Sequence, residues 1–394
     1  MSIALTPAQE TARYIDSLGP EALAKAQAYT TGDHWLLLGG AIVSILVAWL
    51  IIRLGLLDRI AKRLSGRSWA PATFGVSAAF LAISSLIELP WTIYTDWQRQ
   101  HAYGLSKQPL GDFLGQEALS TAISVVLTGL FLLGVYALIR KAGARWWLWG
   151  GGFAGLVTAL MLLAGPSLID PLFNKYEPVP PGPVLTALEQ IADDVKIPHD
   201  RIFMYDGSRQ SERFTANVAG IGPTARIAIS DVALKQASLA EVRAVTGHEA
   251  GHYKLGHVWR AVVVLPLIAL LFFFLLGRLF TAAARLLGSD ARLDEPRGLP
   301  VFTVIGSVLA LLLTPVMSSL TRIGESEADA YSLSTVNEPD ALASALVKTA
   351  EYRYPRPSAL EEALFYDHPS VEKRVLRAME WKAAHPHPGA PPAQ

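Results

Sequence analysis

The run Ala261-Val-Val-Val-Leu-Pro-Leu-Ile-Ala-Leu-Leu-Phe-Phe-Phe-Leu-Leu276 decides the class of fold, because it contains no charged side chain. It lies within Val258 to Phe280, which has the length of about 20 apolar residues that a helix needs to cross the hydrocarbon core of a bilayer. The segment just before it is of the opposite kind, since His248-Glu-Ala-Gly-His252 holds two histidines and a glutamate. A membrane-spanning segment and a segment suited to chemistry therefore lie side by side in the chain.

Six stretches meet the same test of length and apolarity. They run from Trp35 to Leu57, Pro71 to Tyr94, Ala118 to Ile139, Trp146 to Ile169, Val258 to Phe280 and Leu299 to Leu320. Of the 394 residues, 51% are hydrophobic and 17% are charged, against roughly 25% charged in soluble domains. The alternative is that one or two of these stretches are buried core helices of a soluble protein. The uncharged run 261–276 favours membrane-spanning helices instead. We expect a multi-pass α-helical membrane protein with about six spans.

Charge and cysteine content narrow the partners and the chemistry. The 34 basic and 34 acidic side chains balance, so no overall field attracts nucleic acid. The chain has no cysteine, which leaves histidine and carboxylate as ligands for any metal. We expect a lipid bilayer as one partner, and neither nucleic acid nor nucleotide among the others.

The links between spans carry information on orientation. Arginine and lysine are concentrated in residues 53–67, 140–145 and 278–297, and with six spans these links fall on one side. The positive-inside rule makes that side cytoplasmic and places the polar stretch Asn174 to His257 opposite. Residues 1–34 lack the continuous apolar core of a cleavable signal peptide, so the first span is expected to be an uncleaved anchor.

A small folded insert is expected between the fourth and fifth spans. Its elements are an amphipathic helix after the Pro/Gly-rich linker 177–183, strands at 201–205, 214–219 and 226–230, and a long helix that starts at a capping box of Ser238 and Glu241. We divide the chain into a polar N-terminal segment (1–34), four spans (35–170), an α+β insert of zincin type (171–257), a transmembrane hairpin with a third-ligand helix (258–335), a C-terminal helical region (336–384) and a disordered tail (385–394).

The pentapeptide His248 to His252 lies in that long helix. Residues four apart share one helix face, so both imidazoles can bind one metal ion while Glu249 addresses a water beside it. This is the arrangement of zinc hydrolases, and the alternative is a solvated face of histidine and glutamate. His257 is nine residues beyond His248 and half a turn out of phase on the same helix, so we expect it to point away and to mark the membrane boundary.

A tetrahedral zinc site needs a third protein ligand, and the topology indicates Glu325. The fifth and sixth spans leave just after His252 and return just before Glu325, so an up-and-down hairpin brings the two together. Arg322, Glu325 and Asp329 share one face, whereas Glu327 lies about 160° from Glu325. Asp329 suits the role of accepting the free ring N–H of a ligand histidine, and Arg322 that of bracing the carboxylates or stabilising charge on the substrate. An interfacial charged face is the alternative.

Five groups of landmarks occur in order along the chain. They are Leu89-Pro90-Trp91 with His101-Ala-Tyr-Gly104, Ile169-Asp-Pro-Leu-Phe-Asn-Lys175, His248-Glu-Ala-Gly-His-Tyr-Lys-Leu-Gly-His257, Arg322-Ile-Gly-Glu-Ser-Glu-Ala-Asp329 and Asp367-His-Pro-Ser370. This series resembles the integral-membrane CAAX prenyl protease type 1 family, the zinc proteases that remove the last three residues of prenylated proteins. The resemblance extends from about Trp35 to Met379.

The resemblance implies one zinc ion held by His248, His252 and Glu325, with Glu249 as the catalytic glutamate. It implies spanning helices that enclose an intramembrane chamber with the metal at its rim, a prenylated or membrane-associated protein as substrate, and a cytoplasmic catalytic side. This last point conflicts with the charge of the links, and we favour the side that the resemblance implies. Members often have an additional N-terminal span, giving seven, which residues 1–34 are too polar to supply.

Two further site residues follow from the resemblance. Asn217 is implied to bind the substrate backbone, although the Asn-Ala-Tyr pattern usual there reads Asn217-Val218-Ala219 in this chain. His368 is implied to position the substrate or to stabilise the oxyanion, and its alternative role is that of a capping residue before Pro369.

Three other functions remain open at this point. A broader quality-control zinc protease that cleaves misfolded membrane proteins shares the catalytic motif. A transporter is disfavoured, because the ionisable cluster lies at the ends of spans rather than in their middle. An inactive scaffold homologue is disfavoured by the presence of Glu249.

Overall fold

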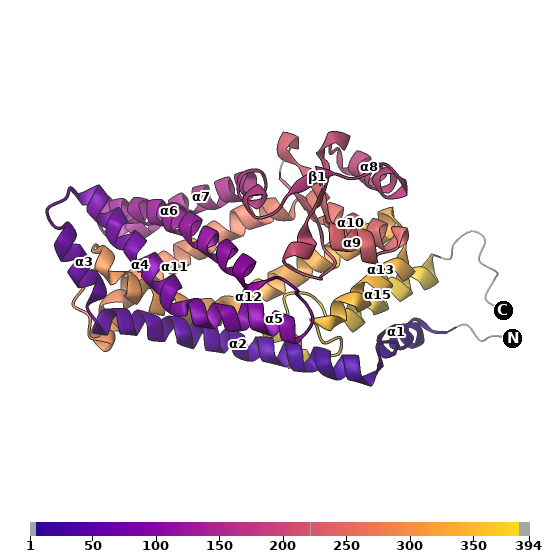
Figure 1. Ribbon diagram of the computed structural model, residues 1–394, viewed down its shortest axis with the longest axis horizontal. Helices are drawn as coiled ribbons and strands as arrows, with labels where there is room; N and C mark the ends of the chain where they lie inside the picture. The colour runs from indigo at the N-terminus through magenta and orange to yellow at the C-terminus, as the bar shows by residue number, and fades with distance from the viewer. Residues whose placement is uncertain (1–4, 221, 386–394) are drawn as a thin grey trace.

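The computed structural model describes residues 5–220 and 222–385, and helices dominate this part of the chain (Figure 1). Each apolar stretch forms a long helix, namely α2 (Gly19–Arg53), α4 (Trp69–Thr92), α6 (Leu110–Ala142), α7 (Trp146–Leu168), α11 (His257–Leu287) and α12 (Leu299–Thr335). They make up five continuous helical stretches long and apolar enough to cross a membrane, because α6 and α7 are joined through the turn Gly143–Arg145. Phe131 stacks on Phe153, so α7 folds back along α6. The prediction of a multi-pass helical membrane protein is confirmed.

The six long helices close a ring. Each contacts the next in the order α2, α4, α6, α7, α11, α12, and α12 returns to α2. Small residues allow the closest contact, since a Cβ added to Gly151 or Gly155 of α7 would lie 2.4 Å from Leu270 or 2.7 Å from Pro266 of α11. Large apolar side chains on the ring are exposed, among them Leu86 (69%), Leu267 (60%) and Leu312 (69%). Apolar surface of this extent is suited to lipid.

The N-terminal segment is polar, as expected, but it is helical. A capping box of Thr6 and Gln9 starts α1 (Pro7–Asp16), and α2 begins at Gly19, well before the apolar stretch. Hydropathy marks only the part of a helix that meets lipid, so it misses this extension. Two C-terminal elements, α13 (Pro339–Lys348) and α15 (Val371–Ala384), hold α1, where Tyr14 donates to Asp340 at 2.8 Å.

The insert forms a four-stranded sheet with the order β1-β2-β4-β3. Its elements are β1 (Tyr176–Pro178), α8 (Pro183–Val195), β2 (Ile202–Tyr205), β3 (Ala216–Ala219), β4 (Arg226–Ser230), α9 (Asp231–Gln236) and α10 (Leu239–Lys254). Strand β4 pairs parallel with β2 and antiparallel with β3, so β3 lies at one edge. The short elements β1 and α9 were not expected, because three and six residues give no readable periodicity. The sheet packs α8 and α10 against one buried core that includes Leu188, Ile227 and Val242.

The remaining helices named here are short and lie in the links between the ring helices or in the C-terminal region. They are α3 (Leu56–Leu64), the π-helical turn Ile93–Gln98, α5 (Arg99–Ala102) and α14 (Ala359–Phe365). The arginine-rich links lie together at the end of the ring away from the sheet (Figure 1). Arg297 pairs there with Asp58 of α3 at 2.9 Å, and Arg140 lies over the ring of Trp69. Most of the tail expected to be disordered, residues 386–394, lies outside the described residues.

Candidate metal centre

Helix α10 is fixed at its start and along its length. At its start the Ser238 hydroxyl accepts from the Glu241 N–H, and the Glu241 carboxylate accepts from the Ser238 N–H at 2.8 Å. Along its length two glycines admit α12 closely, because a Cβ at Gly247 would lie 2.5 Å from Val336 and one at Gly251 would lie 3.1 Å from the backbone of Ala328. The sequence of the motif therefore sets the distance between α10 and α12.

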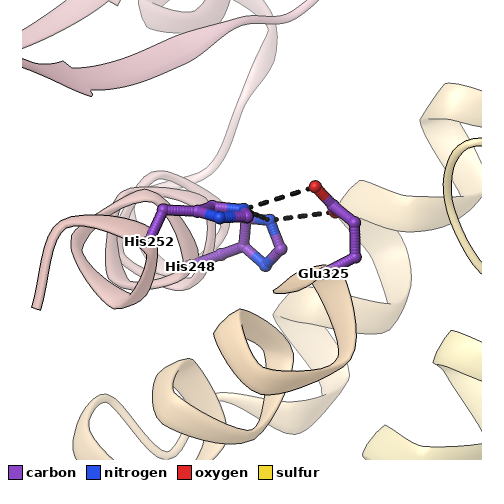
Figure 2. A group of neighbouring side chains, drawn as sticks. All are labelled: His248, His252 and Glu325. Carbon is purple, nitrogen blue, oxygen red and sulfur yellow. Dashed lines mark hydrogen bonds and ion pairs between the residues drawn. The ribbon is translucent and has the colours of Figure 1, made fainter. Parts of the chain in front are cut away.

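Two histidines of α10 and one glutamate of α12 meet in a triangle (Figure 2). The His248 and His252 Nε2 atoms are 3.1 Å apart. Each lies 3.3 Å from one oxygen of Glu325, His248 from Oε2 and His252 from Oε1. A tetrahedral ion with bonds of about 2.0–2.1 Å separates its ligand atoms by about 3.3 Å. The three edges of the triangle thus match the spacing of a small tetrahedral metal site.

Hydrogen bonds on the far side of the rings assign the tautomers. Asp329 lies 2.9 Å from His248 Nδ1, and a carboxylate can only accept, so this nitrogen donates. Glu327 accepts from His257 Nε2 at 2.9 Å, which leaves His257 Nδ1 to accept from His252 Nδ1 at 2.7 Å. Both Nε2 atoms then present lone pairs to each other and to a carboxylate. A metal ion bound by all three groups resolves three acceptors at this spacing, so the donor set fits a metal ion.

The location of His257 corrects an expectation. We expected it to continue the metal helix and to point away, but Gly256 has a left-handed φ of +69° and separates α10 from α11. The change of direction brings His257 back against His252. A glycine two residues after the last helical residue is a common helix-termination signal, and it was readable in the sequence.

Glu249 faces the cavity beside the metal ligands. This cavity, of about 220 Å³, is also lined by His248, Glu325 and His368. Burial raises the pKa of the Glu249 carboxyl, although the neighbouring histidines oppose the shift. A carboxylate with a raised pKa takes and returns a proton more readily near neutral pH. Glu249 therefore lies in the cavity next to the metal site, with a carboxyl group whose pKa is raised by burial.

His368 reaches the same site from the segment between α14 and α15. Its Nε2 atom lies 3.3 Å from Oε1 of Glu325, and its Nδ1 atom lies 2.8 Å from Asp367. Burial lowers the pKa of the imidazole, although the hydrogen bond to Asp367 opposes this. Asp367 thus orients the His368 imidazole and holds it beside the metal ligands.

The structure adds a buried arginine that the sequence analysis missed. Arg374 of α15 donates from Nε to Asp329 Oδ2 at 2.8 Å and from Nη2 to Oδ1 at 2.7 Å. Its Nη1 atom lies 3.5 Å from Glu325. Arg374 therefore fixes the carboxylate that orients His248. The sequence held one indirect signal, because a buried Asp329 beside a metal site needs a cationic partner.

Arg322 and Asn217 lie apart from the ligand triangle. Arg322 donates to the backbone carbonyls of Glu362 and Tyr366, so the expectation that it braces the carboxylates is not met. Its long side chain turns to the carbonyl groups at the end of α14, which a helical wheel cannot show. Asn217 lies in the middle of β3, and its Oδ1 atom is buried without a hydrogen-bond partner.

Replacing Arg374 with methionine is expected to destabilise the protein by about 3–5 kcal/mol, because the buried Asp329 would lose its two charged hydrogen bonds and keep only the His248 N–H and the more distant Arg377. Arg377 offers a matched control, since its side chain is 37% exposed and lies 3.7 Å from the same carboxylate. Its replacement by methionine is expected to cost at most about 1 kcal/mol. Unfolding of both variants in detergent compares them, and equal losses would contradict the assignment of Arg374 as the partner of Asp329.

Comparison with known proteins places this site and this ring of helices in a family. The model of peptidase family M48 matches residues 182–382, which include the ligand triangle. A second model, described as CAAX prenyl protease N-terminal with five membrane helices, matches residues 6–175. Four of the six long helices, α2, α4, α6 and α7, lie in that range. Helix α1 also lies there, but its 10 residues are too few to cross a membrane.

Relatives match over most of the chain. The uncharacterized metalloprotease YhfN of Bacillus subtilis is 26% identical and covers 94% of this chain and 88% of its own. The CAAX prenyl protease 1 homolog of Arabidopsis thaliana is 28% identical, and the match covers 78% of this chain and 73% of the Arabidopsis protein. The crystal structure of S. mikatae Ste24p shares the fold, with a TM-score of 0.76 at 22% identity over 95% of both chains. The chain belongs to peptidase family M48 and is an integral-membrane metalloprotease.

Proposed function

We propose that this protein is a zinc endopeptidase of the CAAX prenyl protease type, which hydrolyses peptide bonds near the C-terminus of prenylated or membrane-associated substrates. The ligand triangle of His248, His252 and Glu325 carries the proposal, because it lies where the insert meets the ends of membrane helices. CAAX prenyl protease 1 homologs from Arabidopsis thaliana and Homo sapiens are among the relatives and support the substrate class.

An apolar cavity beside the metal site supports a lipidated substrate. The cavity, of about 200 Å³, lies between α11 and α12 and reaches His252 and His257 at one end. Its other walls include Val264, Leu265, Met317 and Leu320. A prenyl chain needs apolar walls, whereas hydrolysis needs water and charge, and the two environments adjoin here.

The proposed chemistry assigns a role to each group of the site. When bound, zinc lowers the pKa of water and polarises the scissile carbonyl. Glu249 takes the proton from the attacking water and returns it to the leaving amine. Asp329 holds His248 in the tautomer that leaves Nε2 free for the metal.

Two further residues are proposed to act on the substrate. The His368 imidazole lies beside Glu325, where it can stabilise charge that develops on the carbonyl oxygen. The unpartnered amide oxygen of Asn217 can bind the peptide backbone.

Cleavage of a farnesylated C-terminal peptide by the detergent-purified, zinc-loaded protein tests the proposal. We expect loss of the last three residues, and loss of this activity in a metal-stripped sample that zinc restores. Cleavage of unprenylated, unfolded membrane proteins with no cleavage of the farnesylated peptide would instead favour a broader quality-control protease.

We propose that the catalytic side faces the cytoplasm, on the strength of the family resemblance. The arginine-rich links at the opposite end of the ring assign the reverse orientation under the positive-inside rule. A reporter fused after Met379 decides between the two, since α15 lies at the catalytic end (Figure 1). Fluorescence of a fused green fluorescent protein is expected, and activity of a fused alkaline phosphatase would contradict the proposal.

A further inference from the structure

The cavity that contains Glu249 extends beyond the metal ligands. It is lined by His248, Glu325 and His368 and also by Thr349, Tyr352 and Arg353. Phe214, Thr215 and Ala216 line it as well, so the cavity reaches the first residue of the edge strand β3 and the two residues before it. A peptide whose scissile bond lies at the metal can therefore place its following residues along these three, as a strand added to a free edge.

Two arginines lie beside Tyr352, one of the residues that line the cavity. The guanidinium carbon of Arg213 lies 4.4 Å from the centre of the Tyr352 ring, and that of Arg353 lies 5.7 Å from it. The two cations thus approach one aromatic side chain that itself lines the cavity. This places two planar donor groups, each able to bind a carboxylate through paired hydrogen bonds, beside the same ring.

The charge of Arg213 is not neutralised within the described part of the chain. Its Nη2 atom donates to the Tyr29 hydroxyl at 3.0 Å and to Oε1 of Gln100 at 2.9 Å, and both partners are neutral. Its Nε atom is buried without a hydrogen-bond partner. A half-buried arginine without a carboxylate within ion-pair distance is uncommon, because such side chains are usually paired.

Arg353 is also poorly paired. Its nearest carboxylate within the described residues is Asp367, at 3.9 Å, and the same Asp367 oxygen accepts from His368 at 2.8 Å. The carboxylate of Asp33 pairs with Arg99 at 2.5 Å. Among the described residues neither Arg213 nor Arg353 has a close carboxylate of its own, which favours an anionic ligand.

A chain of contacts limits the distance from the ligand triangle to Arg353. Contacts of 3.3, 2.8 and 3.9 Å lead from Glu325 through His368 and Asp367 to Arg353. Arg353 therefore lies within reach of three to four residues of extended peptide, roughly 10–14 Å.

We propose that Arg213 and Arg353 bind the free α-carboxylate of the substrate and thereby fix the cleaved bond about three residues from its C-terminus. The inference rests on the proposed function, because it takes a C-terminal peptide as the substrate. The pair acts as a specificity determinant that measures length from the chain end, without contact with the reacting atoms. The apolar cavity between α11 and α12 borders His252 and shares no lining residue with the cavity that holds Arg353, so it suits the lipid on the preceding residue.

Binding of two farnesylated peptides that differ only at their C-terminus tests the anchor without turnover. The protein is the zinc-loaded Glu249→Gln variant in detergent, and the labelled peptides end in a carboxylate or in an amide. We expect the carboxylate peptide to bind about 10- to 100-fold more tightly, as for hydrogen bonds to a charged group. In the same background, Arg213→Gln or Arg353→Gln is expected to bring the ratio of the two affinities close to one.

Lys107 provides the matched control for the arginine variants. Its side chain is 77% exposed and pairs with Glu212, the residue that precedes Arg213 in the chain. Lys107 is not among the residues that line the cavity. Lys107→Gln is expected to keep the full preference for the carboxylate peptide. Equal affinity of the parent protein for the two peptides, no binding of either, or an unchanged preference in both arginine variants overturns the anchor.

The turnover assay separates failure of the anchor from failure of the proposed function. If the wild-type protein cleaves the carboxylate and amide peptides at equal rates, the protease assignment stands and the anchor is wrong. If the carboxylate peptide binds preferentially but neither peptide is cleaved, the anchor stands and the protease assignment is wrong. A peptide lengthened by two residues is expected to be cleaved two residues further along, which an anchor near the scissile bond would not produce.

Discussion

Replacing Glu249 with glutamine is expected to lower kcat by about 10²- to 10⁴-fold, the usual contribution of a group that transfers a proton in the transition state. Glutamine keeps the size of the side chain and removes its ability to take a proton. Glu249 is not part of the ligand triangle, so zinc content is expected to stay at one ion per chain. The effect should appear in kcat rather than in KM, because the substrate contacts remain in place.

Measurement of turnover and bound zinc on the same sample checks this result. Full zinc occupancy with lost turnover assigns proton transfer to Glu249. Loss of zinc together with turnover would instead make Glu249 a support of the metal site. Turnover above about one tenth of the wild-type value would remove it from the mechanism. The restored activity of a metal-stripped wild-type sample after zinc addition shows that the comparison concerns active protein.

The sequence predicted those features that depend on helical periodicity and chain direction. His248 and His252 share a face because they are four residues apart, and this is a property of every α-helix. Glu325 could be predicted because two consecutive spans of similar length bring the chain back to the side of the membrane on which the first of them began. The structure brings these three residues together at distances suited to one metal ion. Local geometry was sufficient for both inferences.

Features that depend on long-range packing were not predictable in this way. Arg374 reaches Asp329 from a helix that begins 42 residues further along the chain, and no spacing rule connects the two. Arg213 and Arg353 meet at Tyr352 through two loops whose course the sequence does not determine. In each case a partly buried charge shows the need for a partner, but only the folded chain shows which partner it has.

Helical periodicity alone misplaces a side chain where a helix ends early or where the side chain is long. His257 was read on the helix of His248, although Gly256 ends that helix and redirects the chain. Arg322 was placed by its angle, although its long side chain extends along α12 to the carbonyl groups of Glu362 and Tyr366. Glycine termination signals and side-chain reach therefore need the same weight as periodicity.

Glu325 and Glu327 allow the metal assignment to be tested by one substitution at two sites. They lie two residues apart on α12, and Glu→Gln changes neither length nor shape. The Glu325 oxygens lie 3.3 Å from both ligand nitrogens. The Glu327 carboxylate instead pairs with His257 and Arg260 at 2.9 Å. The two glutamates therefore have the same side chain but different partners, and only Glu325 lies at the ligand nitrogens.

Glu325→Gln is expected to lower zinc affinity by more than about 100-fold, because even loss of a group that merely supports a ligand costs about 10- to 100-fold. Glu327→Gln acts only through His257 and His252, so its cost is expected to stay within about 10-fold. Zinc retained during dialysis against graded chelator measures both, and turnover should fall in parallel. Equal zinc loss in the two variants would show that Glu325 supports the site without binding the ion. If the Glu325→Gln variant retained its zinc while the Glu327→Gln variant lost it, the third ligand would be a residue other than Glu325. His368, 3.3 Å from Glu325, would be the first candidate to test.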